Sequence, residues 1–574
     1  MNRGFIYVFT LILLFHMGAS GARAQSVYDS LLLNSNVYRE KLHLFTDRSV
    51  YAAGETMRFR LHNQSHHLLK ENSWSKVVYL ELISSYLTSV AQGKYTLKPD
   101  GASGQLTIPD TLATGVYHLI AYTKWMRNFS SSEYFHLPLV VISPQKIPAS
   151  ELTTGTIPLE EKKREAFSSE GIICTTDLPV YGKREKVKLQ LTLDSTMATC
   201  DGLSVSVVKK GYLDAGTPGN SQKGGGDQIE PGKILYYPET KGMSISGTVF
   251  QGTQEQPVPF ANIHMTLLGP NPDYFAIVAD DRGGIHFSIP NSTGSRDVLI
   301  TGDGNSESGY KLSLDEEYSQ DYSGISAISL EPGNVSGDIV DEVVRYSQLR
   351  KAFLPENKDS ISVTAGDTVP AFYGTPEFSY AIDDFIEIPS VEEFILELIP
   401  YVQVKSYQKK KYISILDEAG PISEYPPLIL VDFVPGLDTE TILAVSTRQI
   451  ASIDVINKVY IRGNSAYGGI ISIKSREGNL VGINLPGGSS LLNYSTLNNA
   501  KQTEFPDYGS KEYNKRVPDL RTTLYWNAQK EILAGQEEGI EFYTSDIYGT
   551  YVAIVRGMTP KGEIVKGVCE FRVE

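Results

Sequence analysis

Apolar and polar residues alternate along much of this chain, in short runs separated by turn-forming residues. From residue 41 the chain reads KLHLFTDRSVYAAGETMRFRLHN, in which residues 42, 44, 57, 59 and 61 are apolar and flank a turn. This pattern predicts two β-strands joined by a turn. Further apolar runs at 77–83, 104–108, 116–122 and 135–142 have the spacing of strands in a β-sandwich, so residues 25–146 are expected to form one such domain.

An internal repeat predicts a second sandwich. The phrase TDRSVYAAGE at Thr46 recurs as TDLPVYGKRE at Thr176, 130 residues later, and is again followed by alternating apolar residues. The pattern stops at the Gly-rich segment 215–232, but strands similar to those at 104–123 return at 539–559. We therefore expect one sandwich built from 166–240 and 505–574 and divided by an insertion, since lengthening a loop costs little entropy. The alternative is a separate small C-terminal domain.

The insertion itself divides into three parts. Residues 241–312 show four short strands and turn signals, which predict a small β-sandwich. A connector at 313–375 contains a helical pattern at 341–352. Residues 376–485 mix strands with helices, one of which begins with the capping box Ser390 and Glu393, and are expected to form an α+β domain.

The composition agrees with a mainly β chain. It has 574 residues, with 50 Gly and 34 Tyr, and long helical patterns are few. The net charge of −15 argues against nucleic acid as a partner, because binding phosphates requires clustered Lys and Arg.

The three cysteines, Cys174, Cys200 and Cys569, all fall in the divided sandwich. A bridge between Cys174 and Cys569 is one hypothesis, and small buried thiols are the other.

The N-terminus has the three parts of a secretory signal peptide. Arg3 precedes a short apolar run at 5–15, and small residues lead to Ala22 and Ala24. We expect residues 1–24 to be removed on export. The alternative, a retained membrane anchor, requires about twenty apolar residues, and this run is shorter.

Three segments resemble known families. The phrase TDRSVYAAGETMRFR resembles the macroglobulin-type domains of bacterial α2-macroglobulin-like proteins, although the second copy has Arg184 where the phrase has Gly. ISGTVFQGTQEQPVPFANIHM with DDRGGIHF resembles the carboxypeptidase regulatory-like domain, a transthyretin-like sandwich. PLILVDFVPGLD with ILAVSTRQIASIDVINKVYIRGNSAYGGIISIKS resembles the end of the plug domain of TonB-dependent receptors.

The order of these segments is similar to that in envelope proteins of Bacteroidetes that combine macroglobulin-type and plug-like domains. The resemblance implies immunoglobulin-like sandwiches, a transthyretin-like sandwich and a plug-like domain used for binding or docking. We expect the residues after Gly478 to form a linker and sandwich strands in place of a receptor's barrel.

No arrangement of nucleophile, base and stabiliser is evident in the sequence, and we expect no enzyme activity and no cofactor. The histidines lack metal-ligand spacing, and Asp280 and Asp281 before Gly283 and Gly284 fit a turn better than a calcium loop. The Cys-Gly-Glu-Gln phrase of macroglobulins that trap proteases through a thioester is absent.

Two sets of residues are candidates for function or for structure. Gly463, Tyr467, Gly468 and Gly469 are candidate partner contacts, because glycines permit tight turns and an exposed Tyr supplies contact area; a structural hairpin turn is the alternative. The repeated phrase contributes Tyr51, Gly54 and Glu55, then Tyr181 and Glu185, which we interpret as shaping turns between strands.

The sequence therefore predicts an exported protein of the periplasm or outer membrane that binds another envelope protein, such as a barrel protein or transporter, through sandwich edges and the plug-like domain. The alternative is a protein that binds an exported glycan or peptide in an aromatic cleft.

Overall fold

The chain is mainly β, as the alternating pattern predicts. The structure, a computed structural model, describes residues 39–64, 75–144, 171–194, 200–213, 234–252, 256–269, 271–289, 293–302, 310–326, 337–353, 370–417, 420–421, 425–463, 465–498, 504–509, 517–532, 535–559 and 563–574. The expected signal peptide, the Gly-rich segment at 215–232 and the side chain of Cys200 lie outside this described part.

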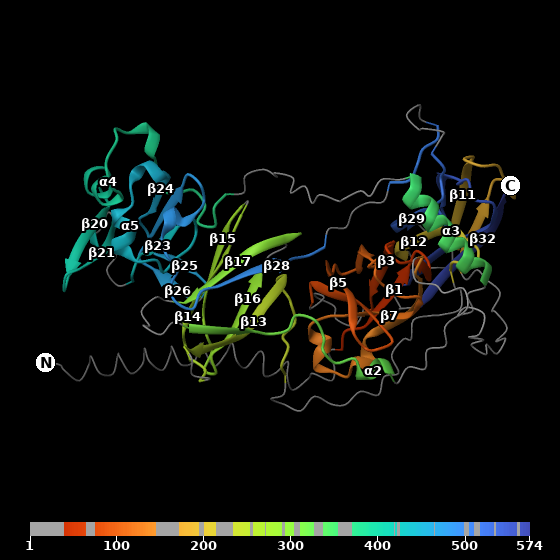
Figure 1. The fold of residues 1–574 in the computed structure, drawn as a ribbon, viewed down its shortest axis with the longest axis horizontal. Coiled ribbons are helices and arrows are strands. Elements are labelled where there is room, and N and C mark those ends of the chain that lie inside the picture. Colours follow the sequence, from red (N-terminus) through yellow and green to blue (C-terminus); the bar gives the residue numbers. More distant parts are fainter. Residues whose placement is uncertain are drawn as a thin grey trace. The chain divides into compact units, whose positions relative to one another are not determined.

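Two compact units share the chain. Unit 1 contains 1–242, 318–358 and 497–574, and unit 2 contains 243–317 and 359–496. Both units are made of segments that are distant in sequence, and Figure 1 colours each segment by its position in the chain.

The N-terminal sandwich of unit 1 packs two sheets. One has the order β1-β3-β6 and the other β2-β8-β7-β4-β5, in which β2 and β8 are parallel. Met57, Phe59 and Leu61 are fully buried between the sheets, as their alternation predicts. The strands are β1 (Leu42–Thr46), β2 (Val50–Ala52), β3 (Thr56–Asn63), β4 (Val77–Ile83), β5 (Ser89–Thr96), β6 (Ala102–Thr107), β7 (Gly115–Tyr122) and β8 (Phe135–Ile142), with 3-10 helices η2 (Trp125–Asn128) and η3 (Ser131–Glu133).

The divided sandwich has the same strand order. Its sheets are β9-β11-β30 and β10-β32-β31-β12-β29, which match the N-terminal sandwich strand by strand, including the parallel pair β10 and β32. Both sheets contain strands from 172–209 and from 523–573, so the two segments fold as one sandwich. The strands are β9 (Ile172–Thr176), β10 (Val180–Tyr181), β11 (Lys186–Leu193), β12 (Cys200–Lys209), β29 (Thr523–Ile532), β30 (Glu537–Tyr543), β31 (Gly549–Met558) and β32 (Ile564–Val573).

The position of the insertion follows from this match. It separates β12 from β29, and the corresponding strands of the N-terminal sandwich, β4 and β5, are joined by the short turn at 84–88. A hairpin turn is a surface loop, where an insertion leaves the core intact.

An apolar cluster joins the two sandwiches and the helix α3 (Gly337–Phe353). It contains Val50 and Ile142 of the N-terminal sandwich, Val208 and Ile554 of the divided sandwich, and Val343 of α3. The connector helix, expected at 341–352, is thus part of unit 1. The short helix α2 (Ser323–Ser326) also belongs to this unit.

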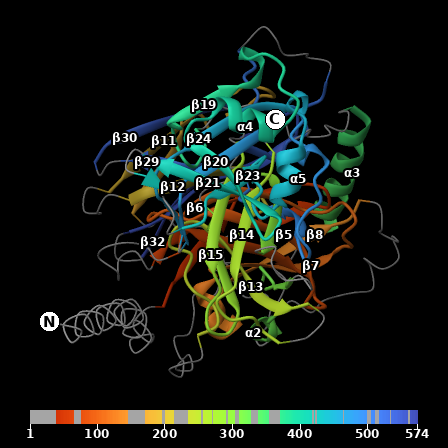
Figure 2. The ribbon, with the colours of Figure 1, turned by 90° about the vertical axis from the view of Figure 1, so that its left-hand side faces the viewer.

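The small sandwich of unit 2 contains one strand, β28, from a segment that was expected to be a linker. Its sheets are β16-β13-β18 and β15-β14-β17-β28, and Figure 2 shows β14 and β15 side by side. Strand β28 pairs with β17 through six residues and comes from beyond the α+β domain. The strands are β13 (Met243–Gln251), β14 (Asn262–Leu267), β15 (Asp273–Val278), β16 (Gly284–Ile289), β17 (Ser295–Gly302), β18 (Tyr310–Leu314) and β28 (Ser490–Ser495).

The α+β domain has a four-stranded sheet, β19-β24-β27-β23, with helices α4 and α5 packed in its apolar core. The side chain of Ser390 accepts a hydrogen bond from Glu393 N, so the predicted helix start is confirmed. The elements are β19 (Phe378–Ala381), α4 (Val391–Leu398), β20 (Val402–Tyr407), β21 (Lys410–Asp417), β22 (Gly420–Pro421), β23 (Leu428–Val431), α5 (Thr439–Ala444), β24 (Ile450–Ile456), β25 (Tyr460–Arg462), β26 (Ser465–Tyr467) and β27 (Ile470–Ser475), with 3-10 helices η4 (Ile382–Asp384), η5 (Thr447–Gln449) and η6 (Leu480–Gly482).

Within the described ranges, no helix combines the length and the apolar character needed to cross a membrane.

Candidate functional site

The repeated phrase builds the same hydrogen-bond network in both sandwiches. The Tyr51 hydroxyl donates to Asp47 Oδ1 at 2.8 Å, and the same oxygen accepts from the backbone N of Arg58 at 3.0 Å. In the second copy Tyr181 donates to Asp177 Oδ1 at 2.6 Å, and Lys188 N donates to it at 3.0 Å. The conserved spacing therefore ties the turn to the following strand, as the structural interpretation of Tyr51 and Tyr181 predicts.

The turn glycine of the first copy is replaced by an arginine in the second. Gly54 has φ +88°, and Arg184 occupies the equivalent left-handed position with φ +52°. A side chain in this region costs about 1 kcal/mol or more. The Arg184 guanidinium compensates by donating to both carboxylate oxygens of Asp546, at 2.8 and 2.6 Å.

We expect the Tyr51→Phe variant to lose about 1 to 3 kcal/mol of unfolding free energy, because it leaves the buried Asp47 carboxylate without one of its donors. Tyr51 is fully buried. Urea unfolding followed by tryptophan fluorescence measures this, since Trp125 and Trp526 lie in unit 1 and the segments of unit 2 contain no tryptophan. Tyr86→Phe is the matched control, because Tyr86 is 88% exposed. Equal stability of the two variants would contradict the assigned role.

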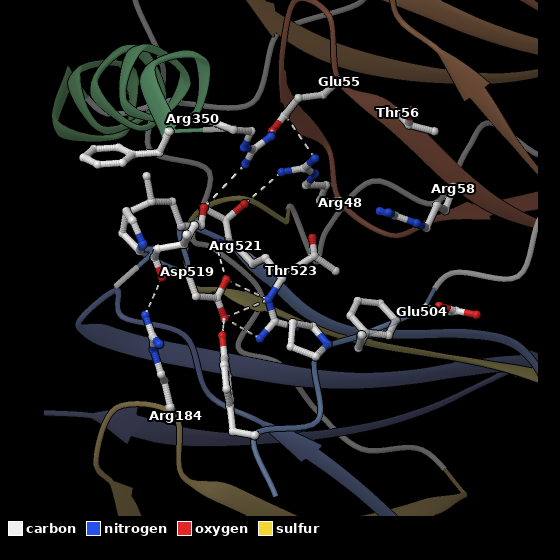
Figure 3. A pocket seen from close by; sticks show the side chains of 18 of the residues that line it. Arg48, Glu55, Thr56, Arg58, Arg184, Arg350, Glu504, Asp519, Arg521 and Thr523 are labelled. Carbon is white, nitrogen blue, oxygen red and sulfur yellow. Dashed lines mark hydrogen bonds and ion pairs between the residues drawn. The ribbon is translucent and has the colours of Figure 1, made fainter. Parts of the chain in front are cut away.

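A cavity of about 790 Å³ opens next to the repeated phrase in unit 1. We call it the arginine cavity, because five arginines line it together with three aromatic and three acidic side chains (Figure 3). The lining residues come from the turns before and after β2, from β3, from the β10–β11 turn, from α3, and from the segment that leads into β29. They are Arg48, Gly54, Glu55, Thr56, Arg58, Arg184, Arg350, Phe353, Glu504, Phe505, Pro506, Tyr508, Val517, Pro518, Asp519, Leu520, Arg521, Thr522 and Thr523.

Glu55 joins two of these arginines at one end of the cavity. Arg48 Nη2 lies 3.0 Å from Glu55 Oε2, and Arg350 Nη1 lies 2.9 Å from Glu55 Oε1, as Figure 3 shows. Burial raises the pKa of Glu55, but the charges of Arg48 and Arg350 outweigh burial and hold the pKa below its ordinary value. Glu55 is therefore ionised at neutral pH, and it fixes α3 to the N-terminal sandwich.

Asp519 organises the other end. Tyr508 donates to Asp519 Oδ2 at 2.8 Å, and Arg521 donates to the same oxygen through Nη2 at 2.6 Å. Arg184 contributes a further contact, from its Nη2 to Val517 O at 2.8 Å. These bonds orient the guanidinium groups before any ligand arrives, and such preorganisation lowers the entropic cost of binding.

The arginines differ in how much surface they present. The side chain of Arg350 is 37% exposed, that of Arg58 22%, that of Arg521 20% and that of Arg184 18%. Arg48 is 7% exposed, and its buried Nε lies 3.7 Å from Asp47 Oδ2 and has no hydrogen-bond partner among the described residues. Guanidinium groups bind carboxylates through paired hydrogen bonds, and aromatic faces provide apolar contact beside them. The cavity is therefore suited to an anionic ligand with a planar acidic group.

Three of the four predicted contact residues in the α+β domain, Tyr467, Gly468 and Gly469, are buried, and Gly463 is exposed. Tyr467 is 8% exposed, and its hydroxyl lies 2.9 Å from that of Tyr274, so the premise of an exposed Tyr is wrong. A side chain at Gly463 would meet Ala276 O at 1.9 Å, and one at Gly469 would meet Ile456 O at 2.5 Å. Gly468 N donates to Pro426 O. These residues form the hairpin turn and pack it against the small sandwich, which is the structural alternative.

The other candidates for chemistry are structural as well. Asp280 Oδ1 accepts from the backbone N of Arg282 and of Gly284, at 2.8 and 2.7 Å, which confirms the predicted turn. Among the described residues no group of three or more His, Cys, Asp and Glu side chains is placed to hold a metal ion.

Sequence reasoning found Gly54 and Glu55 but missed the cavity that they help to line. Arg48 lies within the repeated phrase and Arg58 shortly after it, so these two arginines were the only local indication of a basic site. Arg350 and Arg521 are about 300 and 470 residues away, and no local pattern connects them to the phrase.

Comparisons with known proteins give distant structural likenesses only. No family model and no curated protein matches this sequence. Solved structures that it resembles include the native α2-macroglobulin of Escherichia coli (10% identity, TM-score 0.22, 93% of this chain and 40% of that one) and a Salmonella α2-macroglobulin mutant (9%, TM-score 0.22, 94% and 39%). Latent PorU from Porphyromonas gingivalis is another (9%, TM-score 0.14, 48% and 33%). The chain thus spans about two fifths of the length of these macroglobulins.

Proposed function

We propose that this chain is a non-enzymatic, exported binding module of a bacterial envelope, and that its arginine cavity holds an acidic segment of another envelope protein. The observation that carries the proposal is the convergence of five arginines and three aromatic side chains, from widely separated parts of the chain, on one cavity. The resemblance of the sequence to envelope proteins of Bacteroidetes with macroglobulin-type, carboxypeptidase regulatory-like and plug-like domains supports the setting, the periplasm or the outer membrane.

The charge arrangement favours an acidic partner segment over a neutral one. Glu55 and Asp519 already hold guanidinium groups in place, and the partly exposed side chains of Arg350 and Arg58 add positive charge that favours a carboxylate ligand. An extended peptide carries acidic groups and apolar groups in alternation, which matches a lining of arginines with Phe353, Phe505 and Tyr508.

An acidic glycan is the second candidate, because these same aromatic side chains could stack on sugar rings while the arginines hold a uronate carboxylate. Both candidate ligands carry carboxylates, but one has a peptide backbone and the other is built of sugar rings.

We expect the full chain to bind a fluorescently labelled hexaglutamate peptide and not the hexaglutamine peptide, with affinity that falls as salt rises. Fluorescence anisotropy measures both. The double substitution Arg58→Ser and Arg350→Ser removes two charge-assisted contacts and should weaken binding at least tenfold. Arg476→Ser is the control, because Arg476 is 39% exposed, pairs with Asp383 and belongs to unit 2.

Binding of oligogalacturonate in preference to hexaglutamate would support the glycan candidate. Failure of both anionic probes to bind, or binding that the double substitution leaves unchanged, would overturn the cavity as a ligand site. A pull-down from envelope extracts with the same variants then tests for a protein partner whose capture depends on the two arginines.

A further inference from the structure

The hairpin formed by β20 and β21 in the α+β domain has an unusual tip. Tyr407 pairs with Lys410, so the turn has only two residues, Gln408 and Lys409. Both have positive φ, +50° and +66°. Two-residue hairpin turns of this kind prefer Asn and Gly, and other residues are strained there. The tip thus keeps a lysine where a strain-free turn would have a glycine.

The two faces of the hairpin differ sharply. Val402, Ile413 and Ile415 are buried in the core of the α+β domain. Cross-strand partners lie on the same face, so the register places Lys405 with Tyr412 and Tyr407 with Lys410 on the opposite, outward face. Tyr407 is 69% exposed and Tyr412 is 45% exposed. Lysine and tyrosine therefore alternate over a surface that faces solvent.

This surface is basic in an acidic chain. The sequence has four lysines and no acidic residue between Glu397 and Asp417, whereas the whole chain has a net charge of −15. Figure 1 shows β20 and β21 at the margin of the α+β domain.

The neighbouring carboxylates neutralise only part of this charge. Lys411, on the inward face, pairs with Glu392 of α4 at 2.7 Å, and its backbone N donates to Glu440 of α5. The pKa of Asp438 is lowered mainly by the hydrogen bond from the Thr441 side chain, and the positive charge of Lys410 adds to this lowering. Lys405 and Lys409 form no ion pair with any described residue, and Lys405 Nζ lies 3.4 Å from Ser414 Oγ.

We propose that this outward face of the hairpin, Lys405, Tyr407, Lys409, Lys410 and Tyr412, docks on an anionic lipid surface. Tyrosine is favoured at the headgroup level of a bilayer, because its ring is apolar and its hydroxyl is polar. Long lysine side chains reach headgroup phosphates from the same depth.

The test is co-sedimentation of the full chain with vesicles. We expect binding to phosphatidylcholine vesicles that contain 30% phosphatidylglycerol, little binding to pure phosphatidylcholine, and release in high salt. Each lysine near such a surface contributes about fivefold in affinity, so Lys405→Gln with Lys409→Gln should weaken binding more than tenfold. Tyr407→Ser should weaken it at constant charge.

The control substitutes two exposed lysines elsewhere in unit 2, Lys311→Gln with Lys458→Gln, and should bind as the parent does. Unchanged thermal unfolding of each variant checks that it folds. Equal binding to neutral and anionic vesicles, or equal loss in the control, would overturn the proposal. So would a preference for soluble polygalacturonate over the vesicles, which would assign the face to an acidic polysaccharide.

Discussion

Oxidised protein is expected to contain a disulfide between Cys174 and Cys569 and to unfold with a free energy about 4 kcal/mol higher than the reduced protein. The two thiols lie in β9 and β32, and their Sγ atoms are 2.7 Å apart. Oxidation removes two protons and two electrons, which a thiol oxidant such as oxidised glutathione accepts. The gain is large because the bond closes a loop between residues that are 395 positions apart in the chain.

Thiol titration of the denatured chain measures the bond. The sequence has three cysteines, so oxidised protein should show one thiol and fully reduced protein three. Cys569→Ser should lose the difference in stability between oxidising and reducing conditions, and Cys200→Ser should keep it. Three thiols after oxidation of the folded protein would exclude the bond.

Acidification from pH 7 to pH 5 is expected to lower the stability of unit 1 through His43 and His62. These residues are cross-strand partners on β1 and β3 and are 2% and 4% exposed. Burial and the charge of Arg556 lower the pKa of His43 to about 4. Burial, with the charges of Arg60 and His43, lowers that of His62 well below its ordinary value.

The direction of the effect follows from proton uptake. In the unfolded chain each histidine is protonated below about pH 6.5, whereas in the folded chain both stay neutral until a lower pH. Their contribution is complete above pH 6.5 and is lost as the pH falls from there toward 4. For His43 alone the loss at pH 5 is about 2 kcal/mol, and His62 adds to it in the same direction.

The groups around this pair explain why protonation is resisted. On the side of the N-terminal sandwich lie Arg60, which pairs with Asp100 at 2.9 Å, and the rings of Phe45 and Phe135. On the side of the divided sandwich lies Arg556, whose Nη2 donates to Thr46 O and whose guanidinium stacks on Phe45. A protonated histidine would face two arginines in a buried interface between the sandwiches.

Urea unfolding followed by tryptophan fluorescence at pH 7, 6 and 5 tests this, because the tryptophans report on unit 1. His43→Gln with His62→Gln should reduce the pH dependence, and the remainder includes the contribution of His136 in the same unit, whose pKa burial also lowers to about 4. His286→Gln should preserve it, since His286 is exposed and belongs to unit 2. A parent protein equally stable at pH 7 and pH 5 would contradict the role of the pair.

The strands could be predicted from the order of the residues, because a half-buried strand must alternate apolar and polar residues. So could the repeat, because Asp, Tyr and the following strand form one local network in both copies. The sequence also indicated the divided sandwich, since the missing strands return at the C-terminus. Local hydrogen-bond rules were sufficient for the start of α4 and for the turn at Asp280.

Which faces are buried and which side chains meet depends on packing between distant segments, and the sequence pattern does not show it. Tyr467 has the local pattern of an exposed hairpin residue, but the small sandwich covers it. The alternation of apolar and polar residues along a strand does not show whether another domain packs on the polar face. The six residues of β28, SLLNYS, do not alternate strictly between apolar and polar, and only their pairing with β17 identifies them as a strand. The arginine cavity depends on Arg350 and Arg521 reaching the region of the repeated phrase from distant positions in the chain, and such proximity arises from packing alone.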